Sequence, residues 1–211
     1  MSFPLMPMVS PFSTVPTVTF LSAFTTGNSP VRSASSTAAS NRFIVLATSC
    51  ATNAVMTSCS INGVAAEVAN SGGASFACAF VPTGATVTAT PVFSSGGVAN
   101  TTGMAALYAV YGLESPVWRG TAYNQSNYVY PYPSTATTSI FIPQSGVLFA
   151  PTWMNNDNQS PTFTNATLDF ESDNGGGYGL ATGHRDASNE ATYTVSITAY
   201  AELHMGLGVL R

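Results

Sequence analysis

The sequence contains few charged side chains and no lysine. Five arginines and nine carboxylates make up 7% of its 211 residues, whereas about 25% of an ordinary globular domain is charged. Nucleic-acid binding depends on Lys and Arg that neutralise phosphates, and anionic membrane surfaces attract clusters of the same residues. With a formal net charge of −4, the chain is expected to bind neither nucleic acid nor a membrane.

Cysteine and histidine are also scarce. Cys50, Cys59 and Cys78 stand in no CxxC pair, and the histidines are His184 and His204. A structural zinc site needs four Cys or His ligands at short spacings, so we expect neither a metal centre nor another cofactor. Each cysteine lies in or beside an apolar run, which favours a role as a small buried hydrophobe. One disulfide is the alternative.

The motifs of common catalytic sites are missing. There is no GxSxG, HExxH or phosphate-binding glycine loop, and "HRD" at 184–186 is interpreted as a polar loop before the last strand. In "DFESD", Asp169, Glu171 and Asp173 stand at a spacing of two and would project from one side of a strand. We interpret them as a solvated strand edge, with weak calcium binding or a glycosidase-type carboxylate pair as alternatives. We therefore predict a protein that is not an enzyme.

Hydroxyl and apolar residues take the place of charge. The chain is 45% hydrophobic and 11% aromatic, which is a folding composition and not that of a disordered chain. Serine and threonine number 52, so hydroxyls supply most of the polar surface. A weakly charged surface is poorly protected against association, and we expect neighbouring molecules to cover much of it.

The first twelve residues, "MSFPLMPMVSPF", are apolar and rich in proline. They have no positive charge for a secretory signal, and their prolines prevent a membrane-spanning helix. An extended, polyproline-like strip remains, and each large side chain left in water would cost roughly 1.5–3 kcal/mol relative to burial. We predict that residues 1–16 form an arm that docks on a neighbouring subunit. Folding back on its own domain and disorder stay open as alternatives. The side chains that would dock are Phe3, Leu5, Met6, Met8 and Phe12.

Behind the arm, strand patterns follow one another with no convincing long helix. Asn62-Gly63 suits a type I′ hairpin, "PTG" at 82–84 predicts a turn after which 85–93 pairs back, and "PQS" at 143–145 predicts a tight connection. Residues 192–203 alternate strictly, which predicts one long strand with a single buried face. We find no fixed-period repeat. Residues 17–211 are therefore predicted to form a single all-β domain, an antiparallel β-sandwich or jelly roll.

Residues 114–137 differ from their neighbours, because aromatic side chains are mixed there with Pro, Asn and Ser. We interpret this stretch as a long surface excursion. Aromatic residues and arginine are enriched at interface hot spots, so a subunit interface, a glycan contact and ordinary loop packing are all open interpretations. The candidates are Trp118, Arg119, Tyr123, Tyr128, Tyr130 and Tyr132.

Several short pieces of the chain carry a resemblance. They are "NRFIVLATS", "SINGVAAEVA", "CAFVPTGATVTATPVFS" and "MAALYAVYGLES" between residues 41 and 115, followed by "IFIPQSGVLFA". In this order the chain resembles a β-sandwich module of tailed-phage virion proteins, with Asn62 and Ser145 where that module usually has glycine. The resemblance spans roughly residues 17–203.

The resemblance implies a structural or adhesive role in a virion, with no catalytic residues to carry over. We expect a capsid decoration, neck protein or short tail fibre that forms a homo-oligomer, with a trimer as the working guess, and that contacts other virion proteins. The alternative is a receptor-binding adhesin that recognises host glycan through the aromatic stretch at 118–132.

Overall fold

The computed structural model describes residues 15–25, 31–50, 54–94, 103–127, 132–155, 160–173 and 178–211. Within these ranges all regular structure is β-strand, and every strand pairing is antiparallel. The predicted all-β, antiparallel fold class is confirmed. No described helix is long and apolar enough to cross a membrane.

The strands form four sheets, two from each half of the chain. The first inner sheet has the order β1 (Thr17–Thr25), β9 (Gly103–Tyr111), β3 (Arg42–Cys50), β7 (Ala74–Phe80) and β6 (Glu67–Ser71). The first outer sheet has the order β2 (Arg32–Ser35), β8 (Thr86–Phe93), β4 (Met56–Ile61) and β5 (Val64–Ala65).

The second half repeats this plan. Its inner sheet has the order β10 (Gly120–Ser126), β17 (Glu202–Leu210), β12 (Gly146–Asn155), β15 (Tyr178–Ala187) and β14 (Thr167–Asp173). Its outer sheet has the order β11 (Ser134–Ile142), β16 (Ala191–Ala199) and β13 (Thr162–Thr164). If the two-residue strand β5 is set aside, the described residues of each half form eight strands in the same order. The chain therefore contains an internal structural repeat that we did not predict.

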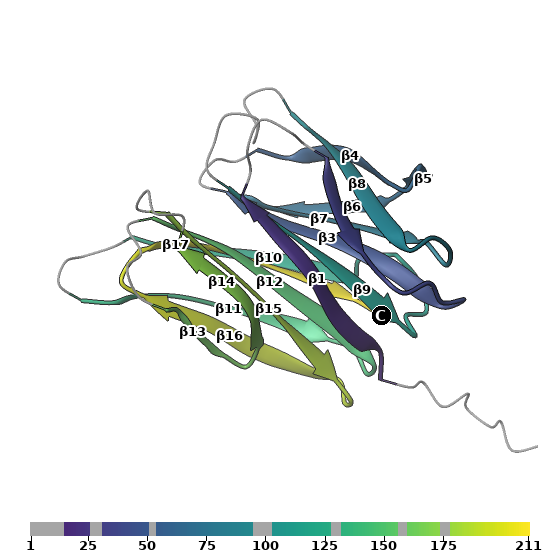
Figure 1. Ribbon diagram of the computed structural model, residues 1–211. Coiled ribbons are helices and arrows are strands. Elements are labelled where there is room, and N and C mark those ends of the chain that lie inside the picture. Colours follow the sequence, from purple (N-terminus) through teal and green to yellow (C-terminus); the bar gives the residue numbers. More distant parts are fainter. Residues whose placement is uncertain are drawn as a thin grey trace, which may run out of the picture.

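The four sheets stack as outer, inner, inner, outer (Figure 1). Three apolar layers separate them. Ile44 and Leu46 belong to the layer inside the first half, Val195 and Ile197 to the layer inside the second, and Phe76 and Phe149 to the layer between the inner sheets. The sandwich is thus doubled, with a shared apolar centre. The assignment of residues 17–211 to one domain stays a prediction, which a single cooperative unfolding transition would support.

Local sequence determines several turns as predicted. Asn62 and Gly63 have φ values of 51° and 79°, and Ile61 pairs with Val64 across them, so the type I′ hairpin is confirmed. Gly84 has a φ of 84° and Ser145 a φ of 58°, at the two other predicted turns. These two turns, however, carry the chain from one sheet to another. In particular, β8 pairs with β4 and β2, so the prediction that 85–93 pairs back on the preceding strand was wrong.

The long alternating stretch 192–203 is a second correction. Val195, Ile197 and Ala199 are buried in β16 as predicted, but the chain bends at 200–201 and continues as β17 in the inner sheet. Alternation continues across the bend because Ala201 and Leu203 are also buried. Periodicity alone therefore did not reveal that the chain changes sheets.

Arg42 is fully buried at the first residue of β3 and uses all five N–H groups of its guanidinium. Nε donates to the Val81 carbonyl (2.7 Å). Nη1 donates to the carbonyls of Ser36 (3.2 Å) and Thr37 (2.8 Å), and Nη2 to those of Thr83 (2.6 Å) and Gly84 (2.9 Å). A guanidinium has five such donors in a planar fork, so this side chain joins the loops that follow β2 and β7 to the start of β3.

The three cysteines are buried, and none of them forms a disulfide. Burial raises the pKa of the Cys59 thiol to about 11 and raises that of Cys78 as well. These values keep both thiols protonated and weakly reactive at neutral pH. The interpretation of the cysteines as small buried hydrophobes is confirmed.

Candidate functional site

The aromatic stretch at 118–132 does not form one exposed surface. Trp118 packs against Phe76 and Phe149, with ring centroids 5.2 and 6.4 Å away, and its Nε1 donates to the Glu67 carbonyl (3.1 Å). It therefore helps to join the two inner sheets. The expected surface excursion is also corrected, because β10 and the start of β11 occupy much of 114–137.

Of the other candidates in this stretch, Arg119 is exposed and Tyr132 is 70% exposed. Tyr128 and Tyr130 lie outside the described residues, as do the arm candidates Phe3, Leu5, Met6, Met8 and Phe12. Their predicted roles in docking or glycan contact therefore stay predictions.

Tyr123 belongs to a polar network between the inner sheets. Its hydroxyl lies 2.5 Å from Nδ1 of His204, whose Nε2 lies 3.1 Å from a Glu202 carboxylate oxygen. Gln125 and Asn155 each donate to the same carboxylate at 3.3 Å. His204 is 4% exposed. Both of its ring nitrogens have hydrogen-bond partners, as is usual for buried polar groups.

The pKa values of this network follow from its hydrogen bonds. Burial raises the pKa of Tyr123 to about 12, and the nearby Cys50 and Glu202 act in the same direction. Burial would raise the pKa of Glu202, but hydrogen bonds from His204 and Asn155 lower it. A neutral phenol and an ionised carboxylate are thus the stable forms at neutral pH. Both ring nitrogens of His204 are occupied by hydrogen bonds to Tyr123 and Glu202. We therefore interpret the network as a structural connection between β10 and β17.

The expected row of three carboxylates is not present. Register shifts between Leu168 and Phe170 in β14, and a bulge of this kind inserts one extra residue and re-aims its side chain. Asp169 consequently points to the inner face, where both its oxygens contact Nδ1 of His184 at 2.7 and 2.8 Å. Glu171 lies opposite Ala181 on the other face and accepts a bond from Ser160 (2.7 Å).

The side chain of Asp173 is not described. Among the described residues no group of three His, Cys, Asp or Glu side chains is placed to hold a metal ion. The prediction that Asp169 and Glu171 share one side of a strand was wrong, and the bulge is the physical reason. "HRD" at 184–186 is likewise corrected, because these residues lie within β15 and not in a loop.

Asp169 and His184 connect the two halves of the chain through Tyr108. The Tyr108 hydroxyl, contributed by β9, lies 2.6 Å from the Thr182 hydroxyl on β15, and its ring lies edge-on to His184 with centroids 6.5 Å apart. Burial raises the pKa of Tyr108 far above its usual value, and the charge of Asp169 adds to this. The sequence did not reveal the pair of Asp169 and His184, because these residues meet only through the register of β14 against β15.

The pKa of His184 reflects two opposing causes. Burial lowers it, but the hydrogen bond and the negative charge of Asp169 outweigh burial and raise it. Burial raises the pKa of Asp186 on the same strand, while His184 opposes this. The imidazolium of His184 is therefore stabilised by its carboxylate neighbour.

We predict a pH-dependent effect of His184→Gln. A histidine with a raised pKa in the folded state contributes stability below its unfolded pKa of about 6.5, and this contribution is lost as the pH rises through the folded value. The variant should lose more stability relative to wild type at pH 5.5 than at pH 8.5, measured as urea midpoints. An equal loss at both values would show that His184 contributes only through packing.

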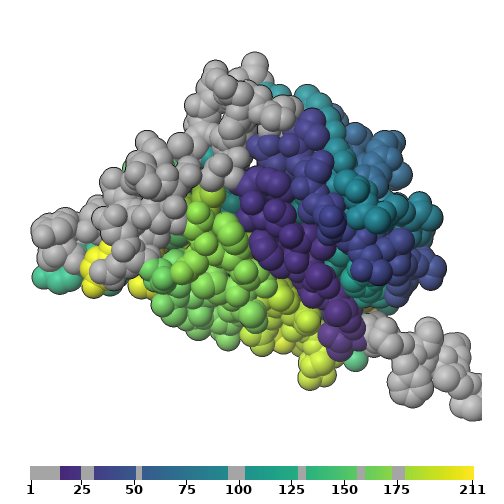
Figure 2. All heavy atoms as spheres, viewed as in Figure 1, coloured from purple at the N-terminus to yellow at the C-terminus, as the bar shows by residue number. Residues whose placement is uncertain are grey.

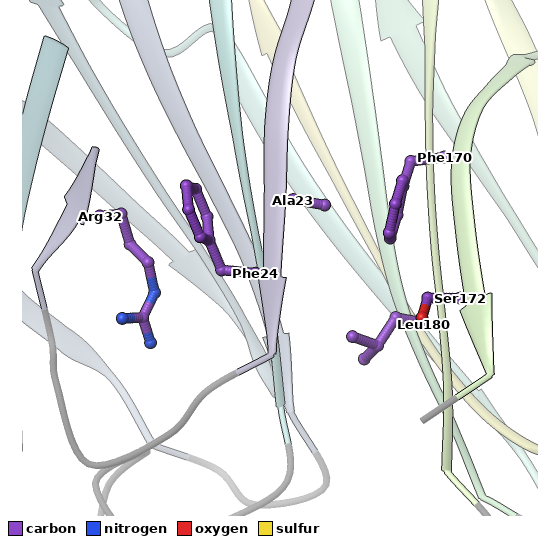
Figure 3. Close-up of a pocket in the computed structure, with 6 residues that line it drawn as sticks. All are labelled: Ala23, Phe24, Arg32, Phe170, Ser172 and Leu180. Atoms are coloured by element: carbon purple, nitrogen blue, oxygen red, sulfur yellow. The ribbon is translucent and has the colours of Figure 1, made fainter. Parts of the chain in front are cut away.

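Two open hollows flank this connection. One, of about 520 Å³, is lined by polar groups that include Thr167, His184 and Asp186. The other, of about 360 Å³, is lined by residues of β1 and of the second half of the chain (Figure 3), and Figure 2 shows β1 lying against that half. In this hollow Ala23 points toward Phe170 and Leu180, while Phe24 turns the other way toward Arg32, whose guanidinium carbon lies 5.7 Å from the centre of the Phe24 ring. Phe20 stacks on Phe170 with centroids 5.8 Å apart, so aromatic packing occupies the contact between β1 and β14.

The comparisons with known proteins do not identify this arrangement. No family model matches the chain, and neither curated protein sequences nor solved structures give a significant match.

Proposed function

We propose that this chain is a non-enzymatic structural protein of a bacteriophage particle, in which its copies assemble with one another and with shell or tail proteins. The observation that carries the proposal is the chemistry of the two outer sheets. Among the described residues, their exposed side chains are hydroxyl or apolar, and the one charged residue in these strands, Arg32, is turned inward and 7% exposed. Surfaces that remain in solvent usually carry charge of both signs, so faces of this kind suit coverage by neighbours.

Two further observations support the proposal. The polar groups most suited to catalysis, His184 and His204, are bonded to carboxylates between the inner sheets, where they connect parts of the fold. The chain also resembles phage virion modules in the motifs of 41–150, although no family model supports the resemblance. The receptor-binding alternative has less support, because Trp118 and Tyr123 of the expected glycan-binding stretch point inward.

Removing residues 1–13 tests the proposed anchor. We expect the shortened chain to fold, with an unchanged far-UV circular dichroism spectrum, but to fail to enter particles. The apolar side chains of the arm gain roughly 1.5–3 kcal/mol each on burial, and that gain would come from another polypeptide. Incorporation is measured by mass spectrometry of purified particles from a host that expresses the shortened chain.

A full-length chain with Phe3→Ser and Phe12→Ser separates the loss of side chains from the loss of length. It keeps the length and the prolines of the arm and loses two docking side chains. It should enter particles less well than the wild type. An unfolded shortened chain, or one that enters particles normally, would contradict the role of the arm.

A further inference from the structure

The exposed face of the second outer sheet is a regular array of hydroxyl groups. β11 contributes Thr135, Thr137 and Ser139, and every second residue of β16 and β13 continues the pattern. The register aligns them in rows across the sheet, with Thr135, Thr198 and Thr162 in one row and Thr137, Ser196 and Thr164 in the next. Two cross-strand hydroxyl pairs bond directly, Thr135 to Thr198 (2.9 Å) and Ser139 to Thr194 (2.8 Å). We call this array the hydroxyl face; its members are Thr135, Thr137, Ser139, Thr162, Thr164, Thr192, Thr194, Ser196 and Thr198.

The hydroxyl face has a regular strand register and no charged side chain. β11 and β16 pair over nine residues from Ser134↔Ala199 to Ile142↔Ala191 with no register shift, and none of the three strands contains a charged residue. Phe141, 54% exposed, lies at one end opposite Thr192. The first outer sheet also exposes hydroxyls, but β2 pairs over only four residues and the pairing of β4 with β8 shifts register at Met56/Ser58.

From this chemistry we infer that the hydroxyl face is an interface with the same face of a second copy of this chain. A hydroxyl is both donor and acceptor, so an array of hydroxyls is complementary to itself, as a two-fold interface requires. Two copies with a net charge of −4 each repel one another, and they approach at least cost through faces that carry no charge. Threonine side chains are stiff at χ1, so little side-chain entropy is lost on contact.

The size of the face determines how strong the contact is. Nine residues at about 3.3 Å and three strands about 4.8 Å apart give at most about 400 Å² per copy. Two copies would bury about 800 Å² in total, half of a standard stable interface of about 1,600 Å². The contact is therefore weak between free molecules and becomes effective when many copies are held close together. The inference rests on the proposed function, since an assembly of copies supplies that closeness.

The test uses the full chain with Thr137→Glu. This substitution places a carboxylate at an exposed position in the row formed by Thr137, Ser196 and Thr164. Its matched control is Thr86→Glu, an exposed threonine on the first outer sheet with the same change in net charge. Sedimentation velocity from micromolar to near-millimolar protein should give a dissociation constant at least tenfold higher for Thr137→Glu than for wild type. The constant for Thr86→Glu should stay within twofold of wild type.

Equal effects of the two variants would overturn the inference, because they would reflect net charge alone. It would also be overturned if the wild type stayed monomeric at every concentration, or if Thr137→Glu removed binding to a glycan array without changing self-association. The proposed function has a separate readout. If the chain is found in particles while Thr137→Glu self-associates like wild type, the inference fails and the proposed function stands.

Discussion

Replacing Arg42 with methionine is expected to lower the free energy of unfolding by about 3–5 kcal/mol, because several buried carbonyls would each lose a donor at a cost of roughly 1–3 kcal/mol. The side chain has no exposed surface, and its five N–H groups all bond to backbone carbonyls. Methionine fills similar volume but donates nothing, so several buried acceptors lose their partner. Each such acceptor costs roughly 1–3 kcal/mol unless water reaches it.

Urea unfolding followed by circular dichroism measures this effect. Arg119→Met is the matched control, because Arg119 is exposed and surface substitutions usually change stability by less than about 0.5 kcal/mol. Arg42→Lys should fall in between, since an ammonium has three donors and lacks the planar fork. A loss below about 1 kcal/mol for Arg42→Met would mean that the loops around Val81 and Gly84 hold their conformation without the guanidinium.

The second large effect is expected for Gly206→Ala, which is predicted to cost about 3 kcal/mol, the upper end of the usual cost of overpacking. A methyl group at Gly206 would overlap the Cβ of Ala74 on the opposite inner sheet. At the neighbouring Gly208, a methyl group would lie 2.7 Å from the Phe76 ring. These glycines of β17 thus let the two inner sheets approach closely, and any side chain there pushes the halves apart.

Gly120→Ala provides the control for Gly206→Ala. Gly120 is also a strand glycine of the second inner sheet, but a methyl group there would meet its nearest atom, Cδ1 of Ile140, at an ordinary 3.7 Å. Glycine weakens strand interiors, so this substitution should be neutral or slightly stabilising in thermal unfolding. If both substitutions changed the melting temperature equally, the close contact between the halves would not be what the glycine at 206 provides.

The fold class could be predicted because short-range patterns determine it. The Asn62-Gly63 hairpin was predicted from the φ values that its turn requires, and β16 from the strict alternation that begins at Thr192. The structural repeat was missed because the two halves share strand order more than sequence. One faint trace existed, since Ala85-Thr86-Val87-Thr88 and Ala191-Thr192-Tyr193-Thr194 open equivalent strands, β8 and β16, with the same alternation.

The candidate sites were harder to predict because they depend on contacts between distant strands. Trp118 and Tyr123 have the composition of a recognition loop, yet the packing of Phe76, Phe149 and His204 turns them inward. The bulge in β14 turns Asp169 and Glu171 to opposite faces of the sheet. No residue type near the bulge predicts it. The role of Arg42 was missed for the same reason, because its five partners come from residues up to 42 positions away.

A density map of the intact particle tests the proposed function most directly. We predict that the map contains several copies of the four-sheet body, with residues 1–13 of each copy lying against a different polypeptide. A particle that lacks this chain would contradict the proposal. Copies that contact no neighbour, with residues 1–13 packed against their own body, would also contradict it.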